Sequence, residues 1–196
     1  MTTSIRSATT SDIAEAAATL ADAFRAYPWT QWSIPEDGYL WRLERLQRLY
    51  LAHALEHGIV LVSDDLGGVA ALLPPDGPPP SETMQAEIAE LMGDRLESVI
   101  GVELPPRMGD SWDFATLGVR QSQSGRGLGS ALISAALTRV AASARPRVSL
   151  ETSSPRNVTL YERHGLTVTA VTEIAQGPSV YTMEIDLAKR GETREA

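Results

Sequence analysis

The sequence contains no cysteine, and histidine occurs only three times. Without cysteine the chain has no disulfide, no thiolate metal site and no thiol nucleophile, so a thioester-linked enzyme intermediate is excluded. His53, His57 and His164 lack the spacing with carboxylates that is typical of a metal site. We therefore expect no metal.

Long apolar runs are also missing. No run approaches the roughly eighteen apolar residues that a membrane span needs. The N-terminal sequence M-T-T-S-I-R-S-A has no apolar signal core. A cytoplasmic protein without a membrane partner is expected.

Positive charge is scarce, because 17 Lys and Arg face 25 Asp and Glu and the net charge is −8. This balance disfavours nucleic acid or an anionic membrane as a partner and suits a cationic small substrate. A chain of 196 residues with 43% hydrophobic content can bury one substantial core. We expect one domain over residues 1–188, a frayed tail over 189–196, and a monomer or homodimer.

Hydrophobic periodicity predicts alternating strands and helices, which is an α/β chain. The helix over 38–56 carries Arg42, Arg45 and Arg48 on one face, where we expect them to be solvated, and the Pro-rich run 74–80 is the one expected flexible segment. Strands are expected near 4–8 and over 59–63, 68–73, 112–119, 147–151, 166–173 and 180–187, and helices over 10–26, 38–56, 81–100, 127–142 and 155–164.

The most informative segment is 117–132, which reads L-G-V-R-Q-S-Q-S-G-R-G-L-G-S-A-L. An apolar strand leads through a polar loop into a helix that opens with Gly125, Gly127 and Gly129. Glycines let the backbone approach a ligand, and the first N–H groups of the helix point at any anion held there. The segment predicts a pyrophosphate site.

Two other nucleotide folds use such a turn. A P-loop needs Lys after the glycines, and Ser130 follows Gly129 here. A dinucleotide fold is a closer rival, because Glu151 ends a strand-like V-S-L-E about twenty residues later, where a ribose-binding acid would lie. The G-x-G-x-G spacing after a five-residue loop disfavours that rival.

A second segment over 150–165 reads L-E-T-S-S-P-R-N-V-T-L-Y-E-R-H-G. Together, S-G-R-G-L-G-S-A-L and N-x-x-x-Y-E-R-x-G resemble the two signature segments of the GNAT acyltransferase superfamily. The pieces L-A-D-A-F-R-A-Y-P, A-T-L-G-V, L-E-T-S-S-P-R-N and Y-E-R-H-G-L-T-V-T-A are similar, in order and spacing, to the puromycin N-acetyltransferases of actinobacteria. This narrower match covers most of the chain.

The resemblance implies the GNAT fold, a mixed, mostly antiparallel central sheet with splayed strands and helices on both faces. It also implies acetyl-CoA as cofactor, with the strand over 112–119 splayed from its neighbour to admit the pantetheine. The residues expected to bind the cofactor are Leu117, Gly118 and Val119 for the pantetheine, Ser124, Gly125, Arg126, Gly127, Leu128, Gly129 and Ser130 for the pyrophosphate, and Asn157.

One position departs from the superfamily pattern. Gln or Arg usually precedes the first loop glycine, and this chain has Ser124 there, with Gln123 one place early. Because backbone N–H groups do most of the binding in such a loop, we expect less side-chain help to the phosphates and retained binding. Arg126 has two open interpretations, a phosphate partner or an exposed arginine.

Tyr161 matches the superfamily tyrosine that lies beside the cofactor sulfur. The resemblance implies that Tyr161 is the acid that protonates the departing thiolate. Its alternative role is packing on an amphipathic helix. The expected oxyanion donor is a backbone N–H near Leu117 or Val119.

Asp113 aligns with a strand position that carries a catalytic glutamate in some GNAT enzymes, and strict strand alternation places it with Leu117, opposite Phe114 and Thr116. Two interpretations stay open: a base in the acceptor cleft, acting directly or through water, or a charge at the mouth of the strand. An amine of modest pKa also needs no dedicated base.

Tyr27 and Trp32 follow the first helix, where superfamily members form a wall of the acceptor cleft, and their rings could stack on an aryl group or nucleoside. For Trp29 we expect a hydrophobic plug between helices.

The resulting expectation is acetyl-CoA-dependent N-acetylation of a small amine by direct transfer in a ternary complex, with a puromycin-like aminonucleoside antibiotic as leading substrate and a role in resistance. The alternatives are a GNAT enzyme for a metabolite amine or peptide N-terminus, and a non-catalytic acyl-CoA-binding sensor.

Overall fold

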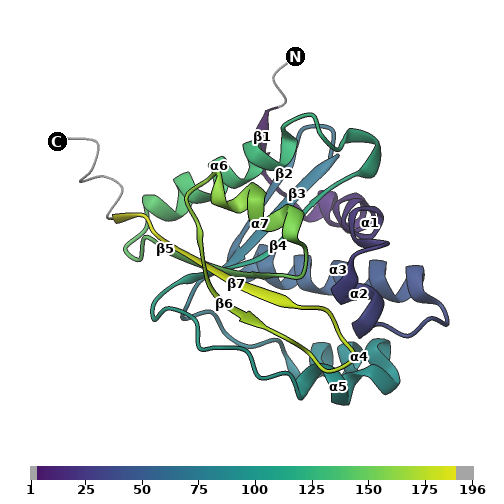
Figure 1. The fold of residues 1–196 in the computed structure, drawn as a ribbon. Helices are drawn as coiled ribbons and strands as arrows, with labels where there is room; N and C mark the ends of the chain where they lie inside the picture. The colour runs from purple at the N-terminus through teal and green to yellow at the C-terminus, as the bar shows by residue number, and fades with distance from the viewer. Residues whose placement is uncertain (1–3, 189–196) are drawn as a thin grey trace.

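The computed structural model describes residues 4–188, and its centre is a seven-stranded sheet in the order β1-β2-β3-β4-β5-β7-β6 (Figure 1). The strands are β1 (Ile5–Ser7), β2 (Ile59–Ser63), β3 (Gly68–Leu73), β4 (Trp112–Val119), β5 (Arg147–Thr152), β6 (Thr167–Thr172) and β7 (Val180–Asp186). The helices are α1 (Ile13–Phe24), α2 (Pro28–Ser33), α3 (Tyr39–His57), α4 (Glu82–Met92), α5 (Leu96–Ile100), α6 (Leu128–Ala141) and α7 (Pro155–Glu162), with short 3₁₀ turns at Thr10–Asp12, Gly93–Arg95 and Gln121–Gln123. The predicted tail over 189–196 lies outside the described residues.

All strand pairs are antiparallel except β4 and β5, and this parallel pair is short. Only Trp112↔Val148 and Asp113↔Ser149 are paired, whereas β4 stays paired with β3 as far as Val119. The two central strands therefore diverge beyond Asp113. The predicted mixed, mostly antiparallel sheet with a splayed central strand is confirmed.

Helices cover both faces of the sheet, as expected for an α/β chain (Figure 1). On one face α6 packs Leu132, Ile133 and Ala136 against Leu72 of β3 and other strand residues. On the other face α1 and α3 pack against a second set, which includes Val69 and Ala71 of β3. The even-numbered residues of β3 thus point to one face of the sheet, which we call the α6 face. Its odd-numbered residues point to the other, which we call the α3 face.

Strict alternation fails in β4. Ala71 pairs with Thr116 and Leu73 pairs with Asp113, so β4 carries one more residue than β3 over this interval. Because paired residues point to the same side, this bulge turns Asp113 and Thr116 to the same α3 face. Phe114 belongs instead to the core on the α6 face. The sequence-based expectation that Asp113 and Thr116 lie on opposite faces is wrong.

Two helical expectations also differ, and one helix was not predicted. The helix expected over 81–100 is broken at Gly93, whose φ of 51° is left-handed, so α4 and α5 are separate. The segment after α1 forms the short helix α2, which begins at Pro28. Arg42 and Arg45, expected to be solvated, bind α4: Arg42 donates to the carbonyl oxygens of Glu90 and Leu91, and Arg45 pairs with Glu87.

None of the helices within residues 4–188 is long and apolar enough to cross a membrane.

Candidate active site

The glycine loop between β4 and α6 has the geometry that an anion site needs. Gly125 and Gly127 have φ values of 79° and 84°, and a Cβ at either would meet no atom within 4 Å. Both positions therefore require glycine for conformation and face free space. Gly127 is also the N-cap of α6, so the first N–H groups of a 14-residue helix point toward that space.

The first half of this loop is fixed to the rest of the protein. Arg120 binds Glu15 and Thr19 of α1, and the Gln121 N–H donates to Asp22 at 2.7 Å. Gln123 donates its amide to Asp65 at 2.9 Å. Gln123 is thus already used in holding the loop. These contacts leave the glycines preceded by a rigid segment.

The remaining loop residues are placed as follows. Ser124 and Arg126 are exposed, and neither side chain has a hydrogen-bond or ion-pair partner among residues 4–188. Ser130, in the first turn of α6, lies 3.1 Å from the Nε2 of His164. Leu128 packs into the core, and a Cβ added at Gly129 would make only ordinary contacts with Val119 and Leu160.

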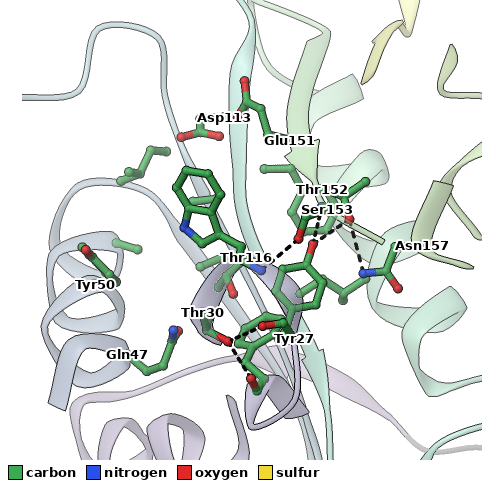
Figure 2. Close-up of a pocket in the computed structure, with 18 of the residues that line it drawn as sticks. Tyr27, Thr30, Gln47, Tyr50, Asp113, Thr116, Glu151, Thr152, Ser153 and Asn157 are labelled. Atoms are coloured by element: carbon green, nitrogen blue, oxygen red, sulfur yellow. Dashed lines mark hydrogen bonds between the residues drawn. The ribbon is translucent and has the colours of Figure 1, made fainter. Parts of the chain in front are cut away.

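Where β4 and β5 diverge, a cavity of about 570 Å³ opens between the two faces (Figure 2). Tyr161 and Asn157 of α7 line it, and so do Gln47 and Tyr50 of α3. The cavity therefore links α7 to α3 through the sheet. It brings together four predicted site residues, Tyr27, Asp113, Leu117 and Asn157, with Tyr161.

Tyr161 is held in the wall of this cavity. It is 6% exposed, and its ring meets Phe114 edge-on with centroids 6.0 Å apart. Burial, with a smaller contribution from Tyr27, raises the pKa of Tyr161 above its usual value. The phenol therefore stays protonated across the physiological pH range.

Asp113 lies in a three-residue ion cluster. The guanidinium of Arg107 contacts Asp113 at 2.8 Å and binds Glu151 through two hydrogen bonds of 3.0 and 2.7 Å. Burial raises the pKa of Asp113, Arg107 opposes that shift, and Glu151 adds to it. Burial lowers the pKa of Arg107, and the two carboxylates more than reverse this, so its net shift is upward. One cation thus serves two acids at the cavity wall.

Tyr27 ties the segment after α1 to the end of β5. Its hydroxyl accepts the Ser153 N–H at 2.7 Å and lies 2.8 Å from the Thr152 hydroxyl (Figure 2). Asn157 donates to the same Thr152 oxygen at 3.4 Å. Both predicted residues line the cavity and join one hydrogen-bonded group.

The two tryptophans are placed differently from the sequence-based expectation. Trp29, expected to be a plug, lines the cavity, whereas Trp32, expected to contact the acceptor, is not among its lining residues. The two rings pack on each other with centroids 5.2 Å apart. Trp32 thus contacts Trp29 from one turn later on α2.

Sequence reasoning missed several lining residues. Arg107 comes from the loop before β4, and no local pattern indicates that it reaches Glu151. Gln47 and Tyr50 belong to α3, where periodicity indicates packing. His53 also lines the cavity, and its ring packs on His57. Within residues 4–188 no three His, Asp or Glu side chains are grouped to hold a metal ion.

No protein-family model matches the chain. Solved structures do match it along almost its whole length. The Corynebacterium glutamicum protein named histone acetyltransferase HPA2 and related acetyltransferase is 23% identical, with a TM-score of 0.73 over 94% of this chain and 96% of that protein. The chain has the GNAT fold.

Two further GNAT-fold structures support this assignment. A GNAT-family protein from Desulfovibrio desulfuricans is 15% identical, with a TM-score of 0.59 over 94% of this chain and 98% of its own. The yncA protein from Salmonella typhimurium, solved with its cofactor acetyl-CoA, is 18% identical, with a TM-score of 0.56 over 95% of each chain.

Proposed function

We propose that the protein is an acetyl-CoA-dependent N-acetyltransferase that acetylates a primary amine of a small molecule by direct transfer in a ternary complex. The observation that carries this proposal is the cavity at the divergence of β4 and β5, which joins Tyr161 on one side to Asp113 on the other. The GNAT fold of the chain and the glycine loop beside the same strand support it.

The residues present fit acetyl-CoA. Beyond Asp113 the β5-facing edge of β4 has no strand partner within residues 4–188, so the main chain of Leu117 to Val119 offers hydrogen-bonding groups to a pantetheine. The N–H groups from Gly125 to Ser130 would hold the pyrophosphate, and Gly125 and Gly127 leave it room. When bound, acetyl-CoA supplies an acetyl group activated as a thioester.

Tyr161 would act as the acid. Its hydroxyl has no hydrogen-bond partner among the described residues, and its raised pKa keeps the phenol protonated. A hydrogen bond from this phenol would stabilise the negative charge that develops on the sulfur as the thiolate departs. A backbone N–H near Leu117 or Val119 would stabilise the oxyanion.

Asp113 and Glu151 would receive the amine. The ion cluster holds two carboxylates and one guanidinium, so its formal charge is −1 when both acids are ionised. A negative wall attracts an ammonium group, and Asp113, whose pKa is raised, is then placed to take a proton directly or through water. Because the chain has no cysteine, the acetyl group passes to the amine without a thioester-linked enzyme.

The narrower substrate proposal is an aromatic aminonucleoside of the puromycin type, which would give the protein a role in antibiotic resistance. It rests on the sequence resemblance and on the aromatic wall of the cavity, where Phe24, Tyr27 and Trp29 offer faces to an aryl group or base.

Free-thiol release tests both levels of this proposal. Purified protein is mixed with acetyl-CoA and puromycin, other aminonucleosides, polyamines or short peptides. Saturable release with puromycin supports the narrower substrate proposal. Release only with other amines contradicts that substrate proposal but still supports N-acetyltransferase activity. Binding of acetyl-CoA without release from any amine would favour the sensor and overturn the enzyme.

A further inference from the structure

On the α3 face of the cavity the amide of Gln47 and the hydroxyls of Tyr50 and Thr116 make no side-chain hydrogen bond within residues 4–188, and the imidazole of His53, which also lines the cavity, packs on His57. Gln47 is 8% exposed. Figure 2 shows Gln47 and Tyr50 reaching from α3 toward the space that Thr116 borders from β4. We refer to these three residues as the α3 polar pocket.

Gln47 occupies a position where packing alone favours an apolar residue. Leu43 and Leu51 lie one turn before and one turn after it on α3, and both are fully buried. The amide of Gln47 makes no hydrogen bond to the described residues but stays open to the cavity, since it is not among their fully enclosed unpaired groups. A leucine at this position would complete the stripe without a polar group to satisfy, so packing does not account for the glutamine.

The α3 polar pocket is electrically neutral, in contrast to the ion cluster on the same cavity. Burial raises the pKa of Tyr50, so its hydroxyl is uncharged at physiological pH. Arg107, the one guanidinium among the lining residues, is already paired with Asp113 and Glu151. The pocket therefore has no free guanidinium for an anionic group.

The amide of Gln47 has two N–H donors and one carbonyl acceptor, and the hydroxyls of Tyr50 and Thr116 can donate or accept. Such a set matches a ligand group that itself both donates and accepts, which is a hydroxyl or an amide. A methyl group in its place would leave the amide unpaired, which is a strong basis for discrimination.

We propose that the α3 polar pocket binds a neutral hydroxyl or amide of the acceptor amine, with Gln47 as the residue that determines specificity. The acceptor is then a primary amine that carries such a group at its far end and no anionic group there. This inference rests on the proposed acetyl transfer and names the substrate class of the same site.

A thermal measurement tests the inference without any amine. We expect Gln47→Leu to raise the melting temperature of the free protein by about 2–4 °C, because a mostly buried amide with no protein partner is replaced by an apolar side chain of similar volume. The matched control is Gln31→Leu, an exposed glutamine of α2, which should leave the melting temperature within about 1 °C. A fall with Gln47→Leu would mean that the amide stabilises the fold, and would overturn the inference.

A kinetic measurement uses amines of equal length: hexylamine, 6-amino-1-hexanol and 6-aminohexanoate, with 2-phenylethylamine and tyramine as an aromatic pair. We expect each hydroxylated amine to have a KM about ten-fold below its hydrocarbon partner, and 6-aminohexanoate to be the poorest substrate. Gln47→Leu should remove the difference within each pair and leave the KM for acetyl-CoA unchanged, whereas Gln31→Leu should preserve both.

Failure of the inference and failure of the proposed function give different results. The pocket proposal is overturned if all five amines turn over with equal KM values, or if Gln47→Leu keeps the preference for hydroxyl. Either result leaves the proposed acetyltransferase activity standing. No thiol release from these five amines or from the aminonucleosides, polyamines and peptides named above overturns the acetyltransferase, and the melting temperature of Gln47→Leu is then the remaining test of the pocket.

Discussion

Removing the hydroxyl of Tyr161 should affect catalysis without destabilising the fold. Tyr161→Phe keeps the ring against Phe114 and removes one oxygen that has no hydrogen-bond partner among the described residues. We expect kcat to fall about 100-fold, since a positioned acid contributes on this order, and the melting temperature to stay the same or rise. Tyr181→Phe on β7 is the control and should leave kcat unchanged. Unchanged turnover in Tyr161→Phe would remove the proposed acid.

Asp113 makes a prediction about pH. Burial raises its pKa, so the ionised carboxylate that accepts a proton forms only above the usual range of an aspartate. We expect kcat/KM to rise with pH through this raised value, and Asp113→Asn to lower kcat/KM about 100-fold and to lose that rise.

The matched control is Asp110→Asn, an exposed acid near the same end of β4. Ionisation of the amine affects all three proteins equally, so the difference between the profiles isolates Asp113. If the profile of Asp113→Asn keeps the wild-type shape, Asp113 serves to support Arg107 alone. The same raised pKa means that Asp113 contributes stability at low pH, and that this contribution is lost as the pH rises through its folded value.

The loop before α6 depends on two left-handed glycines. Gly127→Ala adds a Cβ that meets no neighbour but must adopt a φ of 84°, so its cost is conformational. We expect the KM for acetyl-CoA to rise about ten-fold and the melting temperature to fall by a few degrees, because about 1–2 kcal/mol of strain distorts the anion site. Gly109→Ala, which also meets no neighbour and has no left-handed φ, should change neither value.

Local signals predict this loop and most of the strands. The bounds of β2, β3 and β4 match those expected, since apolar runs between turn residues have few alternatives. The break at Gly93 and the bulge in β4 do not follow from the sequence, for different reasons. A single glycine inside a helical pattern is usually tolerated. A bulge depends on how a strand pairs with its neighbour, and the strand's own sequence does not specify that pairing.

Ligand binding should stabilise the entire chain, because the cavity and the glycine loop draw on both faces of the sheet. Acetyl-CoA at 100 times its dissociation constant adds about 2.7 kcal/mol to the free energy of unfolding, if the unfolded chain does not bind it. For a chain of this size we expect a melting temperature higher by about 5–10 °C, measured by calorimetry. The gain should shrink in high salt as the phosphate contacts are screened. A melting temperature that does not respond would argue against a cofactor site.

The acceptor side of the cavity is the part of the site that could not be fully predicted from the sequence. Tyr27, Asp113 and Tyr161 can be found because they belong to recognisable segments, and the structure brings all three to one cavity. Arg107 and Gln47 lie outside those segments, Arg107 in the loop before β4 and Gln47 on α3. Their roles depend on that loop reaching Glu151 of β5 and on α3 lining the same cavity as β4, which are contacts that no local pattern indicates.

The bulge in β4 also bears on insertions and deletions. From Asp113 to Thr116, β4 has one residue more than the stretch of β3 between Leu73 and Ala71 that it pairs with. This extra residue places Asp113 and Thr116 on the α3 face. Deleting Ala115 would remove the bulge: Asp113, Phe114 and Thr116 would pair with Leu73, Leu72 and Ala71, so Asp113 would stay on the α3 face and Leu117 to Val119 would keep their pairing with β3. Loss of this one codon would thus leave the acceptor and cofactor halves of the site in register, and we expect β4 to tolerate it.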